Sequence, residues 1–290
     1  MKIAFLIVTL FGFSASAFGA SSFVGENIAR KNNLTFGLGY TPTKKTFTPA
    51  RKTGTAISFS AEGDYNFLED YFAGFDLPIY LVDTIASTTK SRFSIGSTSV
   101  NVGLARRMIN DPDQVSWGYA LKLDLFLPTS LQKEAVTLQK LNVPLDLIRY
   151  GRGWASAQPF VTIFTDNSVI LVKGGIGFAY SYIVKKSAAA TSATRKDQNR
   201  MNIPIQAGLS YKLGSSLAIN AEYNTMILDK PTRQLVAIGT KDTRFRQVLT
   251  PSVSGSIKHL DGQVYVNVPI DAASRRTHIV SPGIKVGFSF

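Results

Sequence analysis

The sequence predicts an all-β protein that folds as a closed antiparallel up-and-down transmembrane β-barrel of about twelve strands, with a short helix in the third long loop. Three observations predict this fold. Many segments of about 9–11 residues or slightly more, the length of a tilted membrane strand, alternate apolar residues with polar or small ones. The links between these segments are alternately short and long. After the first twenty residues no apolar run approaches the roughly 18 residues of a transmembrane helix, so only a closed barrel would span a membrane.

Residues 114–127 show the alternation most clearly, with Trp117, Leu121 and Leu123 on one side and Ser116 and Lys122 on the other. Successive side chains of a strand point to opposite faces, so each such segment has one apolar face and one polar or small face. Residues 92–106 change phase near Ser97, which indicates a β-bulge. The expected strands are 33–41, 54–66, 71–81, 92–106, 114–127, 156–164, 169–184, 202–213, 216–227, 247–258, 262–269 and 278–290.

The links indicate how the barrel is oriented. If the N-terminus is periplasmic, the periplasmic turns are short, and they cover 67–70, 107–113, 165–168, 213–216 and 259–262. The outer loops are longer, and they cover 42–53, 82–91, 128–155, 185–201, 228–246 and 270–277. Outer-membrane barrels show this asymmetry, whereas a soluble sandwich has no reason to. In the third long loop, the spacing of Leu131, Ala135, Leu138 and Leu141 predicts a short amphipathic helix that ends before Pro144.

The N-terminus has the pattern of a secretory signal peptide. Lys2 precedes an apolar run and then small residues, with Ala15-Ser16-Ala17 as the cleavage motif. The expected organisation is a signal peptide over 1–17, with cleavage up to residue 20, a short periplasmic segment over 18–32, and the barrel over 33–290. The absence of cysteine excludes a disulfide-rich scaffold and a lipid-anchored lipoprotein. The predicted location is the outer membrane of a Gram-negative bacterium.

The chain has a formal net charge of +13, and its basic residues gather in the long loops. Three interpretations stay open: the loops bind lipopolysaccharide phosphates, they concentrate anionic solutes at the mouth, or they only keep the loops solvated. No nucleic-acid partner is expected, because these residues lie on alternate loops without interleaved aromatic residues. The basic outer-loop residues are Lys44, Lys45, Arg51, Lys52, Lys185, Lys186, Arg195, Lys196, Arg233, Arg244, Arg246, Arg275 and Arg276.

The polar side of the strands would line the lumen, because charged side chains facing lipid are costly. The candidate lumen-lining residues are Glu62, Asp64, Asp76, Lys122, Asp124, Lys212, Glu222, Lys258 and Lys285. Charges of both signs suit either a constriction in a conducting channel or a salt-bridged network that packs a closed barrel. Twelve strands fall between the filled eight-stranded barrels and the open pores of 16–18 strands, so strand number does not decide between the two.

The final residues end on an aromatic side chain. Ile284, Val286, Phe288 and Phe290 share one face of the last expected strand. This pattern resembles the C-terminal signal that the outer-membrane assembly machinery reads in bacterial barrels, so that machinery is an expected partner.

An enzyme is not expected. The chain has two histidines, His259 and His278, and neither lies in a His-x-Ser arrangement that would pair a general base with a nucleophile. No metal-ligand spacing and no phosphate-binding loop is present, so neither a metal nor a cofactor is predicted.

The stretches "YALKLDLFLPTS" and "AQPFVTIFTDNSVILVKGGIGFAY" resemble the middle of the twelve-stranded barrel family of phenol and toluene meta-cleavage pathways, the MetA-type outer-membrane transporters. Ser130 stands where that family usually has glycine, and the acidic residues common after it are absent. The resemblance implies passive uptake of small hydrophobic compounds.

The sequence therefore predicts an outer-membrane channel or transporter for passive uptake of small molecules, with hydrophobic and anionic solutes as candidates. The alternative is a closed structural or surface-interaction barrel whose basic outer loops bind lipopolysaccharide or another partner.

Overall fold

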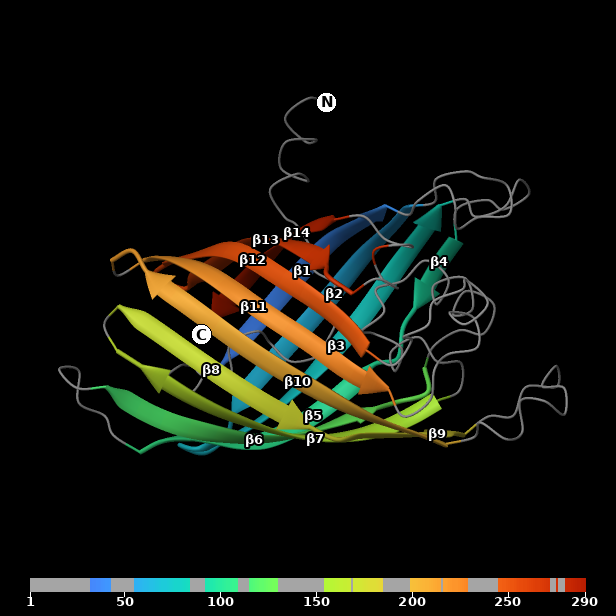
Figure 1. The fold of residues 1–290 in the computed structure, drawn as a ribbon, viewed down its shortest axis with the longest axis horizontal. Coiled ribbons are helices and arrows are strands. Elements are labelled where there is room, and N and C mark those ends of the chain that lie inside the picture. Colours follow the sequence, from blue (N-terminus) through green and yellow to red (C-terminus); the bar gives the residue numbers. More distant parts are fainter. Residues whose placement is uncertain are drawn as a thin grey trace, which may run out of the picture.

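The computed structural model describes residues 32–42, 55–83, 92–108, 115–129, 154–167, 169–184, 199–214, 216–228, 245–271, 275 and 280–290. These residues form one antiparallel sheet of fourteen strands that curls into a barrel (Figure 1). The strands are β1 (Asn33–Pro42), β2 (Thr55–Asn66), β3 (Tyr71–Asp83), β4 (Arg92–Ile95), β5 (Ser99–Arg107), β6 (Ser116–Phe126), β7 (Trp154–Asp166), β8 (Ile170–Gly177), β9 (Ala179–Ile183), β10 (Asn199–Lys212), β11 (Leu217–Leu228), β12 (Phe245–Ile257), β13 (Leu260–Pro269) and β14 (Ser281–Ser289).

The barrel closes between its first and last strands. β1 pairs with β14, with Phe36 opposite Val286, and β10 pairs with both β8 and β11, so no edge is left in the ring of strands. β4 and β5 together occupy one strand position in the ring, and β8 and β9 together occupy another. The fourteen strands therefore make a closed twelve-strand barrel, and the predicted fold class and strand number are confirmed.

The predicted bulge near Ser97 is confirmed as a break between β4 and β5 at residues 96–98. Ile95 lies opposite Ile79 and Val100 lies opposite Phe75, so the apolar side changes from odd to even residues across the break. Thr129 follows β6 and fills the break. Its hydroxyl accepts a hydrogen bond from the Thr98 amide at 2.8 Å and donates one to the Gly96 carbonyl at 2.9 Å.

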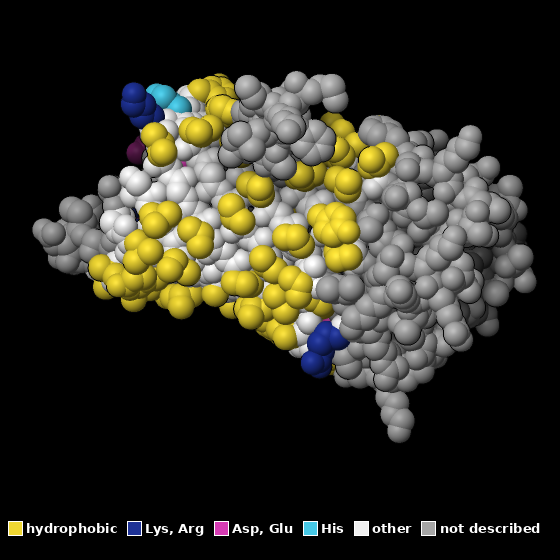
Figure 2. Space-filling view, turned by 90° about the horizontal axis from the view of Figure 1, so that it is seen from above, with side chains coloured by type: hydrophobic (Ala, Val, Ile, Leu, Met, Phe, Trp, Pro, Cys, Tyr) yellow, Lys and Arg dark blue, Asp and Glu magenta, His cyan; other side chains and the backbone are white. Residues whose placement is uncertain are grey.

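The two faces of the sheet are inverted relative to a water-soluble protein. Large apolar side chains such as Leu121 and Ile163 are exposed on the outside, whereas Glu62 and Asp124 are buried inside. Figure 2 shows apolar side chains spread over the described surface, with the few visible charged side chains near its margins. Exposed apolar area on this scale marks a surface that meets another apolar phase, and for a closed barrel that phase is lipid.

No helix within the described ranges is long and apolar enough to cross a membrane. The short links follow β2, β5, β7, β10 and β12 and lie together at one end of the barrel, which we call the short-turn end. The tightest is Lys258–His259, because β13 begins at Leu260 and not at residue 262 as predicted. The ladder to β12 extends the pairing down to Ile257, and the turn is correspondingly shorter.

Several predictions fall outside the described residues. These are the signal peptide, the segment 18–31 and the helix after Ser130. They stay predictions.

Candidate functional site: the charged inner wall

The inner face of the barrel is set by the alternation along each strand. On β6, Ser116, Lys122 and Asp124 are buried, whereas Trp117, Leu121 and Leu125 are exposed. Because neighbouring strands pair in register, inward residues of one strand lie opposite inward residues of the next. The buried polar residues form a wall made largely of Ser, Thr, Asn and Gln, and most of its charged groups lie in three clusters.

The largest cluster, which we call the charged wall, comprises Glu62, Asp64, Asp76, Lys122, Asp124 and Lys285 on β2, β3, β6 and β14. Lys285 Nζ lies 3.2 Å from both carboxylate oxygens of Glu62. The side chain crosses β1 to reach them, and it does so where the residue opposite Lys285 is Gly37, which has no side chain to block it. The ion pair thus joins β14 to β2 across the strand that closes the barrel.

The other carboxylates of the charged wall lie close to this pair. Asp76 lies opposite Glu62 in the β2–β3 ladder. Lys122 Nζ lies 2.9 Å from Asp124 Oδ1, and both side chains are more than nine-tenths buried. Asp64 interacts electrostatically with Lys122, Glu62, Asp124 and Lys285, so all these charges act in one neighbourhood. The sequence placed all six on the inner face, and the structure brings them together there.

A second cluster lies on β8, β10 and β11, and its central residues are Lys173 and Glu222. Lys173 Nζ lies 3.2 Å from Glu222 Oε2, and the amides of Gln206 and Asn224 donate to Glu222 Oε1 at 2.7 and 2.9 Å. Lys173 also crosses a glycine, Gly208, which lies opposite it in β10. Sequence reasoning missed Lys173, although its position between the outward Val172 and Gly174 gave the signal.

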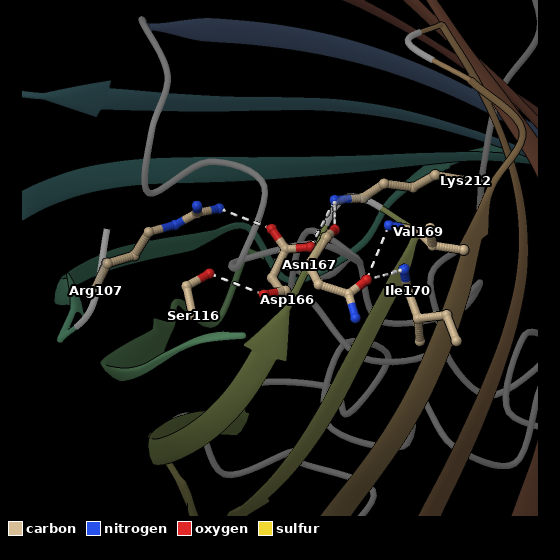
Figure 3. Close-up of polar contacts among 7 residues, drawn as sticks. All are labelled: Arg107, Ser116, Asp166, Asn167, Val169, Ile170 and Lys212. Carbon is tan, nitrogen blue, oxygen red and sulfur yellow. Dashed lines mark hydrogen bonds and ion pairs between the residues drawn. The ribbon is translucent and has the colours of Figure 1, made fainter. Parts of the chain in front are cut away.

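A third cluster lies at the short-turn end and centres on Asp166, the last residue of β7 (Figure 3). Its carboxylate accepts from Lys212 Nζ at 2.6 Å and from Arg107 Nη2 at 3.1 Å. Lys212 also donates to the carbonyl of Asn167, whose own side-chain oxygen accepts the amides of Val169 and Ile170. One carboxylate thus connects β5, β7 and β10 and fixes the turn that follows it. Sequence reasoning named Lys212 but neither Asp166 nor Arg107.

Two predicted residues lie elsewhere than the sequence placed them. Lys258 is in the exposed turn after β12, with a φ of 56°, and so lies beyond the wall and not on it. Arg246 is inside β12 and is 0% exposed, with Nη1 donating to the Phe245 carbonyl and lying 4.0 Å from Asp271 Oδ1. It belongs to the inner face because β12 begins at Phe245, earlier than its pattern suggested.

The other predicted sets divide between described and undescribed parts of the chain. Arg275 is exposed, as expected for an outer-loop residue. The remaining basic outer-loop residues, and His278, lie outside the described ranges. Ile284, Val286 and Phe288 face outward on β14, and Phe290 follows it with its amide donating to the Asn32 carbonyl at 2.9 Å. His259 lies in the turn, where its carbonyl accepts from the Ser289 amide.

Aromatic rings lie flat against the inner wall over glycines of adjoining strands. A Cβ at Gly175 would meet the Phe160 ring at 2.5 Å, and a Cβ at Gly118 would overlap the Phe164 ring and the Arg106 carbonyl oxygen. Gly174, by contrast, has open space around its Cβ position. The missing side chains let these rings lie along the wall instead of projecting across the interior.

The residues that the structure describes contain no group of three or more His, Cys, Asp or Glu side chains that could hold a metal ion.

Comparison with solved structures identifies outer-membrane barrels. The outer membrane channel COG4313 from Pseudomonas putida F1 aligns with a TM-score of 0.61 at 8% identity, over 90% of this chain and 96% of that one. The NanC porin aligns with a TM-score of 0.51 at 9% identity, over 89% of this chain and 98% of that one. Outer membrane phospholipase A from Escherichia coli, at 11% identity over 92% of this chain and 97% of that one, has a TM-score of 0.38, too low to support an argument.

No protein-family model matches the sequence, and no curated protein matches it. At identities this low the solved structures show the fold alone, which is the fold of outer-membrane β-barrels. The predicted class is confirmed at that level. Membership of the MetA-type family and the absence of enzymatic activity stay predictions.

Proposed function

We propose that the protein is an outer-membrane channel for the passive passage of small molecules. The observation that supports this most is the polar inner wall, which carries charges on β2, β3, β6, β8, β11 and β14 inside a closed twelve-strand barrel. Burying charged side chains is costly in a packed apolar interior, whereas a hydrated lumen solvates them. The similarity to the COG4313 channel and the NanC porin in fold is consistent with this proposal.

The composition of the wall favours hydrophilic solutes. Ser60, Gln158, Thr162 and Asn220 are buried on the inner face and offer hydrogen-bonding groups. A hydrophobic compound, which the resemblance to the MetA-type family implies, would leave these groups without partners and so pass less easily. The basic outer loops would bind lipopolysaccharide phosphates at the cell surface, and the C-terminal strand would be the segment that the assembly machinery recognises.

One observation favours the alternative of a closed barrel. Asp124 is 2% exposed, and Lys122 and Glu62 are also more than nine-tenths buried, as in a tightly packed interior. Such a barrel would serve a structural or surface-interaction role through its outer loops.

Planar-bilayer recordings of the refolded protein separate the two. A channel gives discrete conductance steps in potassium chloride, and vesicles containing it swell in isotonic solutions of small sugars. The matched control is the same protein added without refolding. A flat trace in several electrolytes, together with vesicles that do not swell, would rule out the channel and leave the closed barrel.

A further inference from the structure

One strand of the inner wall carries hydroxyl side chains at four consecutive inward positions, and this feature supports an inference that rests on the proposed function. The strand is β12, which lies between β11 and β13 (Figure 1). Leu249 and Val253 are exposed on its outer face, so the residues of the other parity point inward. We call four of these inward residues the hydroxyl track: Thr250, Ser252, Ser254 and Ser256.

Side-chain amides on both neighbouring strands hold the middle of the hydroxyl track. Ser252 Oγ accepts a hydrogen bond from Gln263 Nε2 on β13 at 2.9 Å and another from Asn220 Nδ2 on β11 at 3.3 Å. Asn220 Nδ2 also donates to Ser254 Oγ at 3.0 Å. Because the amides come from β11 and β13, the hydroxyl groups of β12 are fixed from both sides along the wall.

These contacts leave hydrogen-bonding capacity of both kinds along the hydroxyl track. A hydroxyl group has one donor and two acceptor sites. Ser252 Oγ accepts two bonds and keeps its donor, whereas Thr250 Oγ1 donates to Asn267 Oδ1 at 2.8 Å and keeps its acceptor sites. Ser254 Oγ accepts one bond and keeps one site of each kind. Asn220 Oδ1 has no hydrogen-bond partner among the residues that the structure describes, so it adds a further acceptor.

The hydroxyl track is more accessible from the lumen than the charged groups of β6. Thr250, Ser254 and Ser256 are only partly buried. Lys122 and Asp124 of the charged wall are more than nine-tenths buried. A solute that passes the described wall would therefore reach the hydroxyl groups of β12 more readily than the ion pair on β6.

We propose that the hydroxyl track is a binding site for neutral polyhydroxylated solutes, the class of small sugars and cyclic polyols. A solute hydroxyl both donates and accepts, so neighbouring hydroxyls of one solute match the donor of Ser254 and the acceptor sites of Thr250. A simple anion only accepts and an ammonium ion only donates, so either would leave part of the track unmatched. Inward side chains of a strand repeat about every 6.8 Å, so a solute passes from one hydroxyl to the next along the lumen.

Block of the potassium chloride current by myo-inositol in planar bilayers tests the site. The reduction in conductance should saturate as the inositol concentration rises, because a binding site fills. The matched control solute is triethylene glycol dimethyl ether, which has a similar mass but only acceptor oxygens. It should lower the conductance without saturation, through viscosity alone. Ser254→Ala and Thr250→Val each remove one hydroxyl at nearly constant shape, so each should raise the half-blocking concentration of inositol about fivefold.

Ser156→Ala is the matched control variant, because it removes a buried hydroxyl from β7, outside the hydroxyl track. It should leave the half-blocking concentration unchanged. Inositol that acts no differently from the ether would overturn the proposal while the channel function stands. So would a Ser156→Ala variant that weakens the block as much as Ser254→Ala does. A protein without any conductance would remove the proposed function and this inference together. The comparison of the two solutes needs no variant, so it holds even if a variant fails to fold.

Discussion

Replacing Leu121 with arginine tests whether the outer face meets hydrocarbon. Leu121 is the central residue of β6, points outward and is 41% exposed. Each end of the strand is five positions away from Leu121, which at about 3.4 Å per position is roughly 17 Å along the strand. With a tilt near 40°, this is about 13 Å along the barrel axis, close to half of the ~25 Å apolar band. Leu121 therefore lies at the midplane.

An arginine at the bilayer midplane of a β-barrel costs about 2–4 kcal/mol, whereas one near the interface costs about 0–1 kcal/mol. We expect Leu121→Arg to lower the free energy of unfolding by the larger amount. The matched control is Ile257→Arg, at the last residue of β12 on the short-turn end, where the side chain is 72% exposed. Its cost should stay below about 1 kcal/mol.

Urea titrations of both variants in phosphatidylcholine vesicles, followed by tryptophan fluorescence, give the two free energies. The chain contains two tryptophans, of which Trp117 faces outward and reports on the lipid environment. Equal costs at the two positions, or a cost below about 1 kcal/mol at Leu121, would show that the outer face of β6 is not in hydrocarbon.

Three further predictions concern the wall and the C-terminus. Glu222→Gln and Lys173→Met should each lower the free energy of unfolding by roughly 2 kcal/mol, and the double variant should recover most of that loss. If the double variant instead loses the sum of the two single losses in free energy of unfolding, the ion pair is contradicted. Gly118→Ala should destabilise by about 1–3 kcal/mol through overpacking, whereas Gly174→Ala should change stability by less than about 0.5 kcal/mol, and reversed costs in the same titration would disprove the packing. Deleting Phe290 should reduce the amount of barrel assembled in cells, measured by heat-modified gel mobility of membrane fractions, but not refolding into vesicles in vitro; normal assembly in cells would exclude the proposed signal.

The alternation of residue types was sufficient to predict the strands and the faces of Lys122, Asp124 and Lys285. A strand in a membrane barrel has only two environments, and a charged residue is far cheaper in one of them. The phase change near Ser97 was also readable, because a bulge shifts the apolar side by one residue and leaves a local trace.

The strand ends and the ion-pair partners could not be predicted from the alternation of residue types. Arg246 lies within β12 and Lys258 lies beyond its end, because the backbone pairing of β12 with β11 and β13 determines where the strand begins and ends. Lys173 finds Glu222 only through the register of β8, β10 and β11, which places Gly208 between them. These are relations between strands that are distant in sequence, and the pattern within one strand does not contain them.

The most direct test of the membrane barrel is a spin-label scan along β6. The chain contains no cysteine, so single cysteines introduced at residues 119–125 give one labelled site each without further changes. In reconstituted protein we predict that labels at Tyr119, Leu121, Leu123 and Leu125 are accessible to oxygen dissolved in lipid and shielded from a water-soluble nickel complex, while labels at Ala120, Lys122 and Asp124 lack that lipid accessibility. Collision with the nickel complex at Leu121 and Leu123, or an accessibility that does not alternate with a period of two, would contradict the account.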